Sequence, residues 1–371
     1  PDQVRAFIRA AVPFVAPSDE ARAKVAGQIS TPFKAGAEKV EEPAEDAWRT
    51  RLLETDKKAI KPARENVVLA LDGMPELKLP GIPEAAGVIA FNEFTNDVIK
   101  LKAPPWGTAA GVWDEVDALE LGNWLTRTHW LPPMSRQTLE EAVSMVARRH
   151  RYHPVRDKLH RLQGTWDNTP RLKGWLARCC WKGGVAPSTD PKEAADARRY
   201  MARVGTWLVM AICARVLTPG CKFDYMTIFE GKQGLGKSTL ANLLALGAFA
   251  DTGLVLRDKD SYQNLQGVLV YEWGELDALT RAEVTHVKQF ISSRSDRFRA
   301  SFDKRAKDYP RQVVFIGTTN ESHYLSDPTG NRRFWPVKVT RQIDLDWVRE
   351  HLDQLFAEAL HYVAQGWRFY P

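Results

Sequence analysis

The sequence contains little cysteine and no cysteine pair with metal-binding spacing. Its four cysteines, Cys179, Cys180, Cys213 and Cys221, include no C-x-x-C. This pattern argues against a zinc site or a disulfide framework and favours free thiols in a reducing compartment. We therefore expect a cytoplasmic protein.

Long apolar runs are also missing. No apolar stretch reaches the roughly 18–20 residues that span a bilayer, and no apolar signal core follows the N-terminus. The most apolar segment, Met201–Leu217, is 17 residues long and contains Arg203 and Arg215. We expect it to be a buried packing helix, and we predict no membrane partner.

The charge is biased toward basic residues without being extreme. The 371 residues include 52 Lys and Arg against 46 Asp and Glu, a formal net charge of +6. This balance suits a nucleic-acid-binding protein, but many proteins with such a balance bind none. The location of the basic residues is therefore more informative than their number.

The chain divides by composition into several segments. Residues 1–62 are rich in Ala, Lys, Glu and Pro, which predicts a mobile arm with short helices. The segments expected after it are a small α+β module (63–160), a helical connector or collar (161–222), a core of alternating strands and helices (223–340) and a C-terminal helix (341–371). Within the connector, residues 188–217 are expected to form a pair of helices.

The α+β module contains strand-like and helix-like patterns. "NVVLAL" (Asn66–Leu71) and "GVIAFNEF" (Gly87–Phe94) have the composition of strands. Two helices are expected at Asp117–Arg127 and Ser135–Arg149, the second with Ser135 as its N-cap.

The core alternates apolar strands with helices. Strands are expected at Tyr225–Phe229, Gly267–Trp273 and Arg311–Asn320, and a helix at Lys237–Leu246. This alternation predicts an α/β fold with a mostly parallel sheet covered by helices on both faces, preceded by a mainly helical N-terminal region.

A phosphate-binding loop lies between the first of these strands and the helix. "GKQGLGKS" (Gly231–Ser238) fits G-x-x-x-x-G-K-[ST]. The glycines let backbone N–H groups turn toward phosphate oxygens, and the helix N-terminus adds partial positive charge. Lys237 is expected to reach the β and γ phosphates, and the Ser238 hydroxyl to bind Mg²⁺. The predicted ATP-binding residues are Gly231, Gln233, Gly234, Leu235, Gly236, Lys237, Ser238 and Thr239.

Two carboxylates follow the second strand. Glu272 ends the strand, and Glu275 lies three residues further, past Gly274. An acid is needed at this position to orient, and partly deprotonate, the water that attacks the γ-phosphate. Glu272 is, with Ser238, the predicted Mg²⁺ ligand, but which acid orients the water stays open. Asp277 is expected to be a helix N-cap.

A basic segment precedes the third strand. Between Lys288 and Arg311 the sequence has eight basic residues against three acidic ones. Lys304, Arg305 and Lys307 lie at the tip of an expected hairpin, between Phe302 and Tyr309. Basic side chains beside aromatic rings suit a nucleic-acid backbone and its bases, and an ordinary solvated loop is the alternative.

Polar residues follow the third strand. Asn320 ends it, where an amide can hold the attacking water or the γ-phosphate, although a simple turn is the alternative. Arg332 and Arg333 lie further on in "SDPTGNRRFWPV", and either guanidinium could neutralise charge on the transferring phosphoryl group, often across a subunit boundary. A structural ion pair is the alternative for this pair.

Together these motifs resemble the virulence-associated E family, whose members are P-loop proteins of phages and mobile elements related to superfamily 3 DNA helicases. The resemblance rests on Lys-x-Phe-Ile-x(4)-Asp (Lys288–Asp296), the basic hairpin, "GTTN", "DPTGNRRFWPV", "NEF", "HPVRDKL", "TWDNTPRL", "PGCKFDYM" and "EGKQGLGKST". It covers roughly Asn66 to Val339.

The resemblance implies an AAA+ P-loop ATPase core at 223–340, in a homo-oligomeric ring that is usually a hexamer, with single-stranded DNA in the pore. It assigns Walker A to Lys237 and Ser238, Walker B to Glu272, sensor 1 to Asn320, DNA contact to Lys304, Arg305 or Lys307, and the arginine finger to Arg332 or Arg333. ATP and Mg²⁺ are the implied cofactors. A primase or primase-polymerase is an expected partner, in the cytoplasm of a bacterial host.

We therefore predict an ATP-dependent DNA helicase or translocase that acts in the replication of a phage or mobile element. The alternative is an ATP-switched, DNA-binding initiator or loader that does not unwind DNA. Both would use every residue named above.

Overall fold

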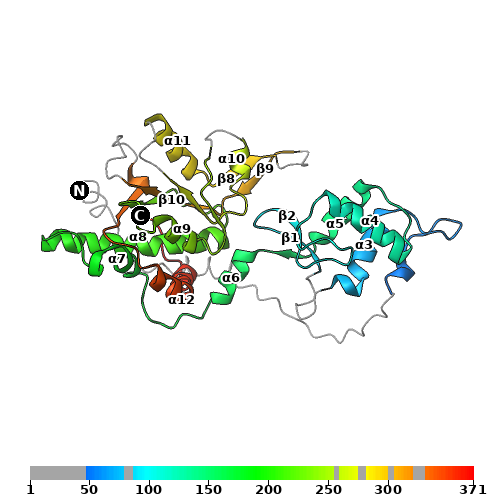
Figure 1. Ribbon diagram of the computed structural model, residues 1–371, viewed down its shortest axis with the longest axis horizontal. Coiled ribbons are helices and arrows are strands. Elements are labelled where there is room, and N and C mark those ends of the chain that lie inside the picture. Colours follow the sequence, from blue (N-terminus) through cyan, green and yellow to red (C-terminus); the bar gives the residue numbers. More distant parts are fainter. Residues whose placement is uncertain (1–46, 79–86, 255–258, 275–280, 300–304, 321–330) are drawn as a thin grey trace. The chain divides into compact units, whose positions relative to one another are not determined.

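The computed structural model describes residues 47–78, 87–254, 259–274, 281–299, 305–320 and 331–371. These residues form two compact units, which divide between Pro154 and Val155 (Figure 1). Most of the predicted arm lies outside the described residues.

The first unit, residues 47–154, packs three α-helices against a four-stranded sheet. The sheet has the order β3-β2-β1-β4, with β1–β2 and β2–β3 antiparallel and β1–β4 parallel. Most of its regular structure is helical, as expected for the region before the core. Its elements are η1 (Arg49–Arg51), α3 (Arg64–Gly73), η2 (Pro75–Leu77), β1 (Ile89–Asn92), β2 (Asp97–Lys100), β3 (Gly111–Val112), α4 (Glu115–His129), α5 (Arg136–Ala147) and β4 (Arg151–Tyr152).

One expectation for this unit is wrong and four are confirmed. The segment 66–71 is part of helix α3, because Val67, Val68 and Leu71 bury one face of a helix; a short apolar run cannot distinguish a strand from a buried helix. The strand β1 and the helices α4 and α5 form as expected. The Ser135 hydroxyl caps α5 by accepting from the Thr138 N–H at 3.1 Å.

The second unit, residues 155–371, is built on a five-stranded parallel sheet. The strands are β5 (Met226–Glu230), β6 (Phe249–Ala250), β7 (Val270–Trp273), β10 (Val314–Thr319) and β11 (Phe334–Lys338), in the order β11-β5-β10-β7-β6. All four strand pairs are parallel, so every carboxyl end lies at the same edge. The three predicted strands and the predicted parallel sheet are confirmed.

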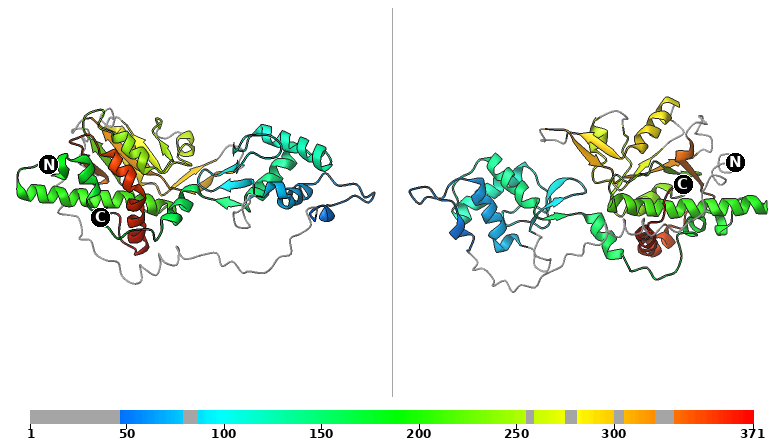
Figure 2. Two further views of the ribbon diagram at one scale, coloured as in Figure 1. Left: turned by 60° about the horizontal axis from the view of Figure 1, so that its bottom comes forward. Right: turned by 180° about the vertical axis from the view of Figure 1, so that it is seen from behind.

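Helices cover both faces of this sheet (Figure 1). On one face α11 (Arg281–Ser292) packs its Phe290 ring 5.7 Å from the Phe315 ring of β10. On the other lie α8 (Pro191–Leu217), α9 (Lys237–Leu244) and α12 (Leu345–Ala364); Figure 2 shows α12 in red beside α8 in green. The remaining elements are α6 (Pro154–Leu162), α7 (Trp175–Cys180), η3 (Lys182–Gly184), α10 (Lys259–Gln263), β8 (Ser295–Phe298), β9 (Lys307–Pro310) and η5 (Asn331–Arg333).

Helix α8 corrects a second expectation. Residues 188–217 do not form two helices but one continuous helix of 27 residues, because no Pro or Gly-rich turn interrupts it after Pro191 at its first position. In the described part of the chain, α8 alone is long and apolar enough to cross a membrane, and 83% of its apolar window is buried inside the unit. Its predicted role as a packing helix is confirmed.

Candidate nucleotide site and basic hairpin

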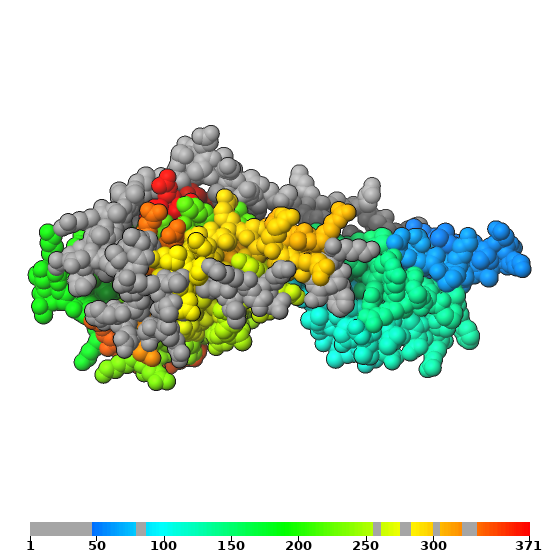
Figure 3. All heavy atoms as spheres, turned by 90° about the horizontal axis from the view of Figure 1, so that it is seen from above, coloured from blue at the N-terminus to red at the C-terminus, as the bar shows by residue number. Residues whose placement is uncertain are grey.

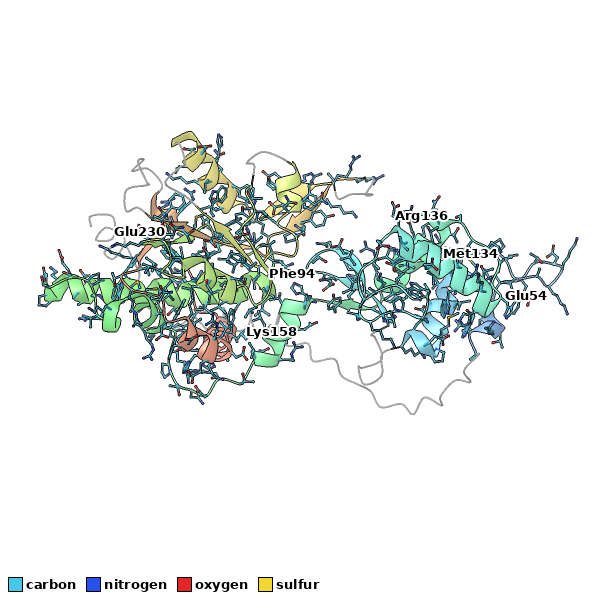
Figure 4. The ribbon with its side chains drawn as sticks, in the orientation of Figure 1. Glu54, Phe94, Met134, Arg136, Lys158 and Glu230 are labelled. Atoms are coloured by element: carbon cyan, nitrogen blue, oxygen red, sulfur yellow. The ribbon has the colours of Figure 1, made fainter. Side chains whose placement is uncertain are left out.

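The phosphate loop follows β5, whose last residue, Glu230, is labelled in Figure 4. Gly234 and Gly236 have φ values of 82° and 87°, which residues with a side chain rarely adopt. A Cβ atom at Gly231 would lie 2.7 Å from the Val339 carbonyl oxygen, so this position also requires glycine. Gly236 is the N-cap of α9. The loop therefore has the glycine conformations and the helix N-terminus that phosphate binding requires.

Lys237 is the first residue of α9 and is 8% exposed. Its Nζ donates to the carbonyl oxygens of Gly231 and Lys232, the second at 3.0 Å, and to Asn320 Oδ1 at 3.1 Å. Asn320 reaches it because β10 pairs with β5 in a register that sets Thr319 beside Glu230. The structure thus brings together the lysine and the amide that the sequence placed at two strand ends.

Glu272 lies on β7 at the same edge and is 4% exposed. Its Oε1 accepts from the Ser238 hydroxyl at 2.7 Å and from the Thr318 hydroxyl at 2.7 Å. Its Oε2 is buried and has no hydrogen-bond partner among the described residues. A buried carboxylate oxygen with no partner is costly unless a cation, water or ligand group reaches it.

Ser238 and Glu272 suit a magnesium ion. Mg²⁺ is usually held by one or two protein oxygens together with phosphate oxygens and waters. The Ser238 hydroxyl, held at 2.7 Å by Glu272 Oε1, provides such an oxygen, and the unpartnered Oε2 belongs to the same carboxylate. Within the described ranges, no group of three or more His, Cys, Asp or Glu residues could hold a metal on its own, so the nucleotide would supply the remaining ligands.

A cleft of about 740 Å³ lies over these residues. The predicted loop residues from Gln233 to Thr239 line it together with Glu272 and Asn320. Sequence reasoning did not find Thr318, Asp251, Gln342 or Leu345, which also line it. The sequence could have indicated Thr318, because it is a polar residue at the end of an apolar strand. No sequence pattern indicated Gln342 and Leu345, since they reach the cleft only because the chain returns beside Gly236.

Three predicted residues are outside the described residues, namely the second acid Glu275, the predicted N-cap Asp277 and the hairpin residue Lys304. The structure therefore does not test them.

The arginine pair lies at the opposite edge of the sheet from the phosphate loop. Arg332 and Arg333 immediately precede β11, whose first residue pairs with Met226, the first residue of β5. Arg333 lies 4.0 Å from Asp224 Oδ2. Arg332 is exposed and forms no ion pair within the described part of the chain. The five residues of β5 separate these arginines from the loop by about 16 Å at roughly 3.3 Å per residue.

The basic segment forms an antiparallel hairpin of β8 and β9. Arg305 and Lys307 are exposed, and the yellow to orange atoms of this segment lie open on one face in Figure 3. Two of the eight counted basic residues are not available to a ligand: Lys288 is 7% and Arg311 2% exposed. The Tyr309 ring stacks on Phe298 at 4.3 Å, so one of its faces is covered.

The buried Arg311 anchors this hairpin. Its guanidinium contacts Asp296 at 2.6 Å, and its backbone oxygen accepts from Gly220 N at 2.8 Å. Arg215 of α8 donates to the Phe223 carbonyl at 2.7 Å, and burial lowers the Arg215 pKa to about 10. The hairpin base is thus fixed to the turn between α8 and β5.

Comparison with known proteins identifies the family of this chain. The family model described as "Virulence-associated protein E-like domain" matches residues 159–370. A comparison with curated proteins found no match.

Several solved structures are similar to this chain at low identity. The A form of the apo NrS-1 C-terminal region is 19% identical, with a TM-score of 0.33; the match covers 57% of this chain and 47% of that one. A second apo structure of this region is 13% identical, with a TM-score of 0.39; the match covers 75% of this chain and 65% of that one. An X-ray structure of JCV helicase is 13% identical, with a TM-score of 0.27, 66% of this chain covered and 70% of that one. The family match spans more than half of the sequence, and the chain therefore belongs to the virulence-associated protein E-like family.

Proposed function

We propose that this chain binds ATP and Mg²⁺ and hydrolyses the nucleotide to move along, or unwind, DNA during the replication of a phage or mobile element. The observation that carries the proposal is the meeting of three strand ends at one cleft. They bring Lys237 to Asn320 and Glu272 to Ser238 and Thr318. A lysine, an amide and a buried acid around a phosphate-binding loop are what ATP hydrolysis requires.

Each side chain has a separate role in this proposal. Lys237 moves from the loop carbonyls to the β and γ phosphates. Asn320 positions the attacking water, and the free oxygen of Glu272 accepts its proton. The Ser238 hydroxyl, which Glu272 Oε1 orients, would hold Mg²⁺, and the bound ion would neutralise charge on the phosphates.

The arginine pair requires a second copy of the chain. About 16 Å of strand separates Arg332 and Arg333 from their own loop, so neither can reach the nucleotide of its own subunit. In a ring, expected to be a hexamer, this edge would face the cleft of the next subunit. Arg332 is the better candidate, because Arg333 faces Asp224.

The hairpin would contact single-stranded DNA in the pore of this ring. Arg305 and Lys307 are exposed at its end, and Lys304 belongs to the same stretch. We further propose a bacterial host cytoplasm and a primase or primase-polymerase as partner, on the basis of the family.

The rival is an initiator or loader that uses the same residues without unwinding. A strand-displacement assay on forked DNA separates the two. We expect displacement that requires ATP and is lost in Glu272→Gln. ATP hydrolysis and DNA binding without displacement on forks of either polarity would favour the loader, and absence of ATP hydrolysis would contradict both.

A further inference from the structure

Another cavity, of about 620 Å³, lies in the same unit between α7, α8 and the start of α12. Figure 1 labels these three helices. Five basic residues line the cavity against one acidic residue. The basic residues are Arg171, Lys173, Arg178, Arg198 and Arg341, and the acidic one is Asp344. We refer to it as the basic pocket.

Not all of these charges are available to a ligand. Asp167 accepts two hydrogen bonds of 2.7 Å from Arg171, so that guanidinium is already neutralised. Arg178, Arg198 and Arg341 form no ion pair with any carboxylate that the structure describes, and Arg178 and Arg198 are exposed. Three arginines without carboxylate partners in a concave surface create a strong positive potential, because low-dielectric walls concentrate the field.

The positions of Arg178 and Arg341 are restrained. The Arg178 guanidinium lies over the Trp347 ring, 5.1 Å from its centroid, and His351 also stacks on this ring at 4.4 Å. Arg341 Nε donates to the Gln342 carbonyl at 3.0 Å, so this bond does not use the two outer nitrogens of the guanidinium. Burial is the main cause that raises the pKa of the Cys179 thiol to about 12, with a contribution from Asp344, whereas Arg178 and Arg341 oppose the rise; both arginines therefore lie near Cys179.

The basic pocket is distinct from the nucleotide cleft, although one segment borders both. Gln342 and Leu345 line the nucleotide cleft, whereas Arg341, Asp344 and Trp347 line the basic pocket. The segment 341–347 is hydrogen-bonded to elements of both cavities. Ile343 N donates to the Leu235 carbonyl of the phosphate loop at 3.0 Å, and Asp344 N donates to the Cys179 carbonyl of α7 at 3.3 Å. No residue lines both cavities.

We propose that the basic pocket is a second nucleic-acid contact, in which Arg178, Arg198 and Arg341 bind backbone phosphates of a DNA strand. The arginines come from three separate elements, which suits successive phosphates along a strand. A guanidinium pairs with phosphate oxygens through two parallel N–H donors. The inference rests on the DNA binding of the proposed function, but on neither hydrolysis nor the hairpin.

The test measures how the affinity for a labelled single-stranded oligonucleotide depends on salt, without nucleotide. The variant is Arg178→Ala/Arg198→Ala, and the control Arg199→Ala/Arg349→Ala removes two exposed arginines of α8 and α12 that do not line the pocket. Each lost phosphate contact lowers the log–log salt slope by roughly 0.7. We expect a decrease of about 1.4 in the variant and almost none in the control.

A charge-conserving variant separates a lost phosphate contact from a folding defect. Arg178→Lys/Arg198→Lys keeps the charges and should retain most of the slope, which a folding defect would not do. Equal slopes for the alanine variant and its control would overturn the inference, even if hairpin variants lose DNA binding as the proposed function expects. Conversely, a slope that is reduced in the pocket variant but not in hairpin variants would support the inference and contradict the proposed contact between the hairpin and DNA.

Free phosphate is the other source of the same chemistry. Pyrophosphate is titrated into a Lys237→Ala protein, in which the phosphate loop is disabled. Binding that depends on Arg178 and Arg198, with an unchanged DNA slope, would mean that the pocket holds a small anion and would overturn the inference. Absence of such binding, together with the reduced slope, supports a DNA strand.

Discussion

At the scale of single residues, the environment of Glu272 explains why hydrolysis is the expected chemistry. One oxygen is oriented by two hydroxyl groups, and the other is buried without a partner among the described residues. The two hydrogen bonds fix the carboxylate, so its free oxygen faces one direction. An acid held in this way is prepared to accept a proton from water.

We predict that Glu272→Gln binds ATP with little change but hydrolyses it about 10²-fold more slowly or worse, because the amide cannot accept the proton. Lys237→Ala should lose nucleotide binding itself. Nucleotide affinity and steady-state turnover are measured for each protein. Glu350→Gln, an exposed acid of α12, is the control. Wild-type turnover in Glu272→Gln would transfer the role to Glu275.

Thr318 gives a second prediction, for a residue that the motif alone did not reveal. Thr318→Val preserves shape but removes the donor to Glu272 Oε1. Turnover should fall about tenfold, as expected for the loss of one orienting hydrogen bond of roughly 1.4 kcal/mol in the transition state. Nucleotide affinity should stay unchanged. An equal loss of affinity and turnover would mean that Thr318 only supports the fold.

At the scale of elements, the hairpin depends on a buried ion pair. Asp296 is 1% and Arg311 2% exposed, and Arg311 also binds the Phe290 carbonyl of α11. The surface pair Arg297–Asp308, at 2.8 Å, lies on the same hairpin but in solvent. The two pairs allow a matched comparison.

We predict that Asp296→Asn destabilises the second unit by roughly 3–5 kcal/mol, because it leaves the Arg311 charge buried without a partner. Asp308→Asn should cost less than about 1 kcal/mol, since water screens an exposed pair. Both are measured from the urea unfolding transition of the second unit, followed by a probe in that unit. Equal shifts for the two variants would show that the buried pair does not fix the hairpin.

The tip of the hairpin gives the next prediction. Replacement of Arg305 and Lys307 by alanine should lower the salt slope of single-stranded DNA binding by roughly 0.7 for each lost contact. Basal ATP hydrolysis should survive, because the hairpin leads into the amino end of β10, opposite the phosphate loop. An unchanged slope in salt titrations would contradict the DNA contact.

Some features of these elements could be predicted from the sequence, and others could not. The grouping of the loop, Glu272 and Asn320 was predictable because each lies at the end of an apolar strand, and the carboxyl ends of parallel strands meet at one edge. Helix α3 was mistaken for a strand, because an apolar run of six residues fits both. Arg311 was counted with the exposed charges, since its burial depends on Asp296, fifteen residues away in the sequence.

At the scale of the whole molecule, the cleft and the arginine pair lie at opposite edges of one sheet. A single chain therefore cannot complete a site that uses both. An arginine supplied by a neighbouring subunit is worth roughly 10³–10⁵ in rate in other nucleotide hydrolases. Assembly should accordingly control hydrolysis, and specific ATPase activity should fall when dilution produces monomers.

The central claim is that ATP is hydrolysed between copies of this chain, and a mixing experiment tests it directly. Arg332→Ala should bind nucleotide but lose hydrolysis, and Lys237→Ala should lose binding. ATPase activity is measured against the mixing ratio, with each variant alone as baseline and subunit exchange verified. We predict activity above both baselines, because some interfaces pair an intact loop with an intact arginine. Strict additivity of the two baselines at every ratio would contradict the claim.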